Sequence, residues 1–84
     1  MSHLQLLSDL PNGTHATVAG LLAGTHAAQS ATAQRLAELG FIAGEPVQML
    51  RRGPGGREPL AVQIGDTQFA LRLLEAQCVE VQVL

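Results

Sequence analysis

Five stretches of the chain alternate between apolar and polar residues, as strands do when one face is buried. Four of them cover residues 47–51, 60–64, 67–71 and 79–83, and a softer one covers residues 14–22. The link Gly65-Asp66 joins two of these stretches. Glycine at the first central position of a two-residue link suits a type II′ turn, so residues 60–71 predict an antiparallel hairpin.

One longer segment, His26 to Leu39, is rich in alanine and predicts an α-helix. Gly40 stands where a helix favours a left-handed residue after its last turn, and Phe41 follows as an apolar contact back onto the helix. The helix is therefore expected to end at Leu39. Residues 73–76 are too few for a full helix and predict a single helical turn.

Two segments lack a periodic pattern. The leucines between residues 4 and 10 precede the turn-forming cluster Pro11-Asn12-Gly13, and we interpret them as an ordered arm that caps the core. Residues 52–59, RGPGGREP, are dominated by glycine and proline. We expect an exposed loop there, without regular structure.

Five short strands and one helix in 84 residues are too few for a sandwich of two sheets. A strongly bent sheet, closed into a partial barrel, buries the apolar faces and limits exposed edges. We therefore expect a mainly β fold, a partly open barrel of about five strands with one α-helix between the first and second strands. Residues 1–84 are expected to form a single domain.

Charge and composition narrow the function classes. The formal net charge is −2, and the chain has five arginines and no lysine. A nucleic-acid partner is not expected, because such binding normally requires a basic surface. No apolar run reaches the roughly 20 residues of a membrane span, and the N-terminus does not resemble a signal peptide. The single cysteine, Cys78, suits a reducing compartment and is interpreted as a small buried residue. We expect a cytoplasmic protein.

Two longer motifs resemble the ferrous iron transport protein A (FeoA) family. The first is RLAELGFIAGEPV at residues 35–47, and the second is FALRLLEA at residues 69–76. The resemblance extends over nearly the whole chain. It implies an SH3-like barrel and an accessory role in ferrous iron uptake. The implied partner is a ferrous iron permease with a cytoplasmic GTP-binding domain, which would recruit the chain to the inner face of the membrane.

Most of the motif residues have a structural explanation. Gly40 allows the helix to end, and the Phe41 side chain is expected to fill the barrel. Arg72 and Glu75 flank the short helical turn and could pair with each other. We expect no enzyme activity, because the sequence has no nucleophile beside an oriented base and no phosphate-binding loop.

Because the resemblance implies a role in ferrous iron uptake, the histidines are considered as metal ligands. His15 and His26 could meet if the helix folds back over the first strand, forming a weak site for Fe²⁺ or Zn²⁺; solvated surface histidines are the competing interpretation. No cofactor is expected to be required. A metal captured there could bridge two molecules into a homodimer. The alternative function is therefore a cytosolic transition-metal carrier or sensor.

The one basic cluster consists of Arg51, Arg52 and Arg57. It is either a solvated loop or a docking patch for an acidic protein surface. Recognition of proline-rich peptides is not expected, because the chain has no Trp or Tyr to line such a groove. An open edge strand would also allow the chain to pair with a second copy of itself.

Overall fold

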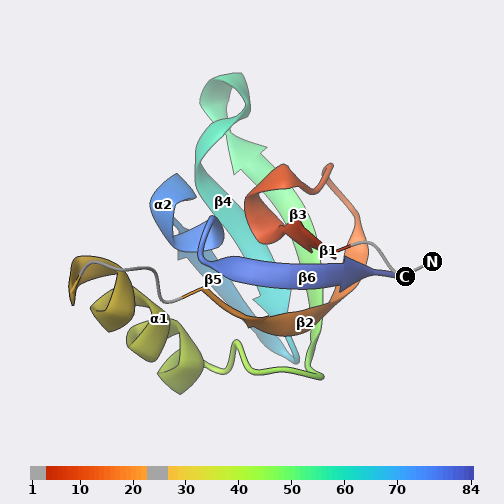
Figure 1. The fold of residues 1–84 in the computed structure, drawn as a ribbon. Helices are drawn as coiled ribbons and strands as arrows, with labels where there is room; N and C mark the ends of the chain where they lie inside the picture. The colour runs from red at the N-terminus through yellow and green to blue at the C-terminus, as the bar shows by residue number, and fades with distance from the viewer. Residues whose placement is uncertain (1–3, 23–26) are drawn as a thin grey trace.

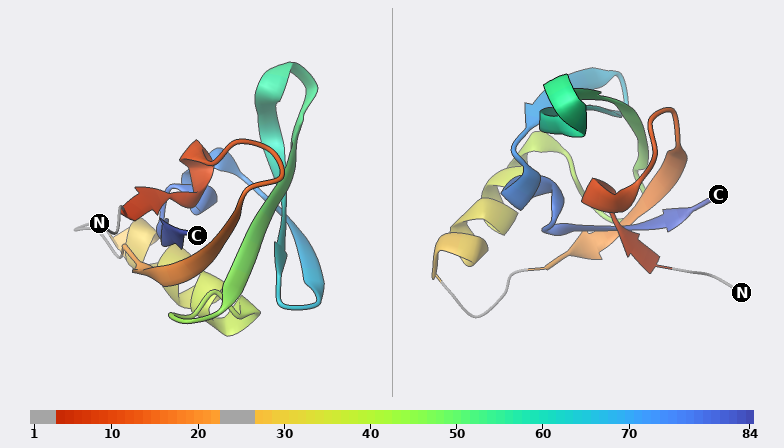
Figure 2. Two further views of the ribbon diagram at one scale, coloured as in Figure 1. Left: turned by 90° about the vertical axis from the view of Figure 1, so that its right-hand side faces the viewer. Right: turned by 90° about the horizontal axis from the view of Figure 1, so that it is seen from above.

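The computed structural model describes residues 4–22 and 27–84. In this part of the chain one antiparallel sheet has the strand order β1-β6-β2-β3-β4-β5. The sheet curls around its own apolar face to form an open barrel (Figures 1 and 2). The strands are β1 (Leu4–Leu6), β2 (His15–Leu21), β3 (Pro46–Gly53), β4 (Arg57–Ile64), β5 (Thr67–Leu71) and β6 (Val79–Val83).

Two α-helices and two short 3₁₀ turns complete the described part. They are α1 (Ala27–Leu39), α2 (Leu73–Ala76), η1 (Leu7–Asp9) and η2 (Pro54–Gly56). The mainly β fold, with its longer helix between the first two predicted strands, is confirmed. The sixth strand is part of the segment that we interpreted as an arm. Its residues 4–6 pair with residues 80–82 of β6.

The end of α1 is the predicted one. Gly40 has a φ of 113°, and its N–H donates to the Ala37 carbonyl at 3.1 Å. The N–H of Phe41 donates to the Leu36 carbonyl at 3.0 Å. This pair of bonds is the Schellman motif, which satisfies carbonyls left open at a helix end. It also directs the Phe41 side chain into the core, where it is 0% exposed.

The hairpin formed by β4 and β5 is also confirmed. Ile64 and Thr67 face each other across the two-residue link. Gly65 has a φ of 56°, whereas Asp66 does not have a positive φ. Positive φ at the first central residue alone distinguishes a type II′ turn from type I′.

The expectation of an irregular loop at residues 52–59 is wrong. Strand β3 continues to Gly53, β4 begins at Arg57, and only residues 54–56 form the turn. A Cβ added at Gly53 would lie 2.3 Å from the Glu58 carbonyl oxygen, so glycine allows the two strands to approach closely. The cross-strand pairs here are Arg52 with Leu60 and Gly53 with Arg57. Pairing therefore overrides the turn-forming composition of the segment.

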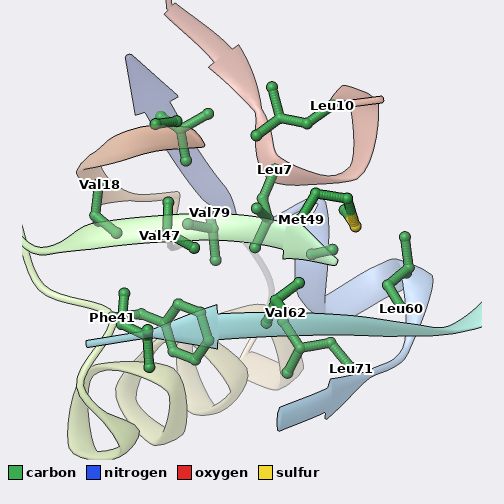
Figure 3. Close-up of a cluster of buried hydrophobic side chains, with 14 of the residues drawn as sticks. Leu7, Leu10, Val18, Phe41, Val47, Met49, Leu60, Val62, Leu71 and Val79 are labelled. Carbon is green, nitrogen blue, oxygen red and sulfur yellow. The ribbon is translucent and has the colours of Figure 1, made fainter. Parts of the chain in front are cut away.

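One apolar cluster fills the barrel, with side chains from the strands, from η1 and from α1 (Figure 3). Cys78 is buried as predicted, at 5% exposed, and is a free thiol. The largest fully buried side chains are Phe41, Leu7, Leu10, Leu36, Met49, Leu60, Leu71, Val18, Val62, Val79 and Val81.

Candidate functional site

The β3–β4 hairpin projects from the barrel and carries the basic cluster. Its tip stands clear of the other elements in Figure 1 and in the left view of Figure 2. The side chains of Arg51 and Arg57 are exposed on it, whereas Arg52 is half-buried. Register shifts interrupt the β3–β4 ladder after Met49 and after Arg52. Such shifts bend and twist a strand, and here they lie at the root of the projecting part.

Arg52 has a structural role that the sequence does not reveal. Its Nη2 atom donates to the carbonyl oxygens of Ser8, at 2.6 Å, and Leu10, at 2.8 Å. Both carbonyls belong to the segment around η1. A guanidinium is well suited to this because it presents several donors in a fixed geometry. Arg52 therefore ties the base of the hairpin to the N-terminal segment, which leaves Arg51 and Arg57 as the exposed arginines of the cluster.

A cleft of about 640 Å³ lies between the hairpin and α2. Leu60 is buried at one wall, and Leu73 at the start of α2 is 42% exposed. Arg52 and Arg57 provide cationic groups, and Pro54 and Gly56 line the side toward the tip. We call this region the hairpin cleft.

Glu58 is the acidic residue in the hairpin cleft, and its carboxylate has a local partner. Its Oε1 accepts a hydrogen bond from the N–H of Leu73 at 2.5 Å, which joins the hairpin to α2. The guanidinium of Arg57 has no carboxylate within ion-pair distance among residues 4–22 and 27–84. The cleft can thus accept an apolar side chain while Arg57 faces an acidic group next to it.

The expected pairing of Arg72 with Glu75 takes a different form. The N–H of Arg72, not its side chain, donates to Glu75 Oε1 at 2.8 Å and caps α2. The Glu75 carboxylate forms its ion pair with the guanidinium of Arg35 on α1. The Glu75 side chain is 13% exposed and that of Arg35 is 55% exposed. The two sequence motifs thus meet in space and join α1 to α2.

The histidine site can be followed only in part. His15 is exposed on β2, opposite Gln48 of β3. His26 lies outside the described residues. Across residues 4–22 and 27–84, no group of three or more His, Cys, Asp and Glu side chains is placed to hold a metal ion. In the same residues, no helix is long and apolar enough to cross a membrane.

Comparisons with known proteins show what the chain is similar to. The FeoA domain model matches residues 5–83. A crystal structure of Stenotrophomonas maltophilia FeoA complexed with zinc is 51% identical, with a TM-score of 0.80 over 92% of this chain and 88% of that one. The FeoA protein from Chlorobium tepidum is 30% identical, with a TM-score of 0.79 over 95% of this chain and 70% of that one.

A manganese-dependent transcriptional repressor shares the fold alone, at 20% identity and a TM-score of 0.80 over 100% of this chain and 44% of the repressor. A search of functionally curated proteins finds no match. The family model spans almost the whole chain, and the fold agrees with that of the solved FeoA structures. This chain belongs to the FeoA family.

Proposed function

We propose that this chain is a cytoplasmic accessory factor of ferrous iron uptake that docks on the GTP-binding part of a ferrous iron permease. Family membership supports the pathway. The relative from S. maltophilia is described as an SH3 domain protein and a candidate ferrous iron transport activating factor. A docking role requires no catalytic step from this chain, and binding would bring it to the inner face of the membrane.

The projecting hairpin is the observation that carries this proposal. Arg51 and Arg57 are exposed on an element that extends beyond the barrel, and Arg57 lines the hairpin cleft together with the apolar residues Pro54 and Leu73. Exposed charges of one sign steer an acidic partner and fix its orientation, and an adjacent apolar cleft supplies contact area. Arg52 would act indirectly, because its bonds to Ser8 and Leu10 hold the base of the hairpin in place.

Calorimetric titration of the chain into the cytoplasmic domain of the permease, with GTP, GDP or no nucleotide, tests the proposal. We expect saturable one-to-one binding that weakens as salt is raised. Replacing both arginines, Arg51→Gln/Arg57→Gln, removes two positive charges from the hairpin. It should weaken binding about tenfold, because each rim charge contributes at most about 1 kcal/mol.

A matched control has the same net charge but leaves the hairpin intact. Gln5 on β1 and Gln82 on β6 are exposed, and neither strand pairs with the hairpin strands β3 and β4. The variant Gln5→Glu/Gln82→Glu should bind like the unmodified chain. Equal weakening in both variants would show that net charge matters and the hairpin does not. No binding of the unmodified chain in any nucleotide state would overturn the docking role.

A metal-binding carrier or sensor is the second candidate. The observation that favours it is the zinc in the structure of the 51% identical relative. In this chain His15 is an exposed donor on β2. Titration with Zn²⁺ and, without oxygen, with Fe²⁺ should then give stoichiometric binding that His15→Ala weakens. Light scattering with and without a chelator would identify a metal-bridged homodimer. Binding that His15→Ala leaves unchanged would exclude that residue as a ligand.

A further inference from the structure

Strand β5 ends the sheet and has a free edge. Its neighbour in the sheet is β4, and no strand in the described residues lies on its other side. In an antiparallel ladder the residues alternate between hydrogen-bonded and non-hydrogen-bonded pairs. The two-residue turn makes Ile64 and Thr67 a bonded pair, so Gln68 and Ala70 are non-bonded. Their N–H and C=O groups therefore point away from β4.

This edge lacks the features that usually protect a strand from further pairing. Proteins blunt an edge with charged side chains, proline, a bulge or a very short strand. Residues 67–71 read TQFAL, with no charge and no proline, and the register with β4 is continuous over all five residues. The other end strand, β1, has only three residues. Of the two edges, β5 is therefore the one suited to accept an additional strand.

A groove of about 460 Å³ lies between α1 and the C-terminal part of β5. Thr32 and Arg35 line it from the α1 side, and Ala70 lines it from β5. The residues after β5 that complete the groove are Arg72, Leu74 and Glu75. Peptides bind by strand addition at exposed sheet edges, where backbone hydrogen bonds provide affinity and pockets for alternate side chains provide specificity.

The charges of the groove select the occupant. Its single carboxylate, Glu75, already accepts the Arg72 N–H and pairs with Arg35. Arg72 is exposed, and its guanidinium has no carboxylate partner among the described residues. Leu74 is 59% exposed and adds an apolar contact. We propose that the β5–α1 groove binds an extended acidic segment of another protein, which pairs with the backbone of Gln68 and Ala70 and places a carboxylate at Arg72.

The proposal predicts that the groove binds acidic segments more tightly than basic ones. Backbone pairing does not depend on the side chains of the bound segment, whereas the guanidinium of Arg72, which has no carboxylate partner among the described residues, favours carboxylates over amines in that segment. Side chains of the bound strand alternate between two faces, so its acidic residues should recur at every second position. Alternating glutamate and valine satisfies both requirements and provides a defined probe. This site is separate from the hairpin cleft, so either can fail without the other.

Amide NMR of the ¹⁵N-labelled chain tests it, with the capped synthetic peptide Glu-Val-Glu-Val-Glu as the probe. We expect saturable downfield shifts of the Gln68 and Ala70 amide protons, because both form new hydrogen bonds. Ala70→Pro removes the outward N–H and should abolish the shift at Gln68. Arg72→Glu reverses the charge and should weaken binding about fivefold. The matched peptide Lys-Val-Lys-Val-Lys should bind the unmodified chain poorly and the Arg72→Glu variant better.

Three results would overturn the proposal. The first is no shift at Gln68 or Ala70 up to a peptide concentration of about 10 mM, which would exclude a Kd of about 1 mM or lower. The second is equal binding by the Ala70→Pro variant, once its spectrum shows that it is folded. The third is concentration-dependent pairing of β5 with a second copy of the chain that the peptide does not reverse.

Discussion

Arg52 provides the sharpest test of how the hairpin is held. The variant Arg52→Met keeps most of the aliphatic stem and removes the donors that reach the Ser8 and Leu10 carbonyls, at 2.6 and 2.8 Å. Hydrogen bonds to a charged group typically contribute about 1.5–3 kcal/mol each. Arg52 is half-buried, so water can partly replace the lost donors. We therefore expect a total loss of about 1.5–3 kcal/mol rather than the full sum.

The assay is urea unfolding followed by circular dichroism, with the melting temperature as a second measure. For a domain of this size, that loss lowers the melting temperature by roughly 6–24 °C. The matched control is Arg51→Met, since Arg51 is exposed on the same strand. It should change stability by less than about 0.5 kcal/mol. The interpretation that Arg52 holds the base of the hairpin to the N-terminal segment is refuted if both variants lose the same stability, or if neither loses any.

Two further substitutions test the contacts of Glu75 and the close approach of the two hairpin strands at Gly53. Glu75→Ala removes the acceptor for the Arg72 N–H and the partner of Arg35, and should cost about 1–2 kcal/mol in chemical denaturation. Glu75→Gln keeps an oxygen acceptor and should cost less; equal losses would contradict the capping role. Gly53→Ala places a Cβ 2.3 Å from the Glu58 carbonyl oxygen and should cost about 1–3 kcal/mol, with amide shifts confined to the hairpin. Gly20→Ala meets no atom within 4 Å and should be nearly neutral, so similar losses for the two glycines would refute the close-approach argument.

Local signals in the sequence were sufficient where one short segment determines the structure. The end of α1 depends on Gly40 and the apolar residue after it, and both are visible in the sequence. The turn at Gly65-Asp66 depends on one positive φ and on the alternation that flanks it. Neither feature needs a distant partner. For this reason both were predicted correctly from the residues alone.

Distant partners explain what the sequence did not reveal. Strand β1 has three residues, too few to show a period, and it exists because β6 pairs with it. The sequence predicts a loop at residues 52–59 because glycine and proline favour turns. Nothing within this segment indicates that β3 and β4 pair across it. Arg52 bonds to backbone carbonyls 42 and 44 residues away, and carbonyls carry no sequence signature. The ion pair of Glu75 with Arg35 likewise joins two residues that are distant in the sequence.

The projecting hairpin is the central element of the proposed function, and amide NMR mapping tests it most directly. The ¹⁵N-labelled chain would be titrated with the unlabelled cytoplasmic domain of the permease in its GTP- and GDP-bound states. We predict that signals of residues 51–58 and of Leu73, which border the hairpin cleft, shift or broaden first. Perturbation confined to β2, β6 or the β5 edge, with the hairpin signals unchanged, would contradict the proposal that the hairpin docks on the permease.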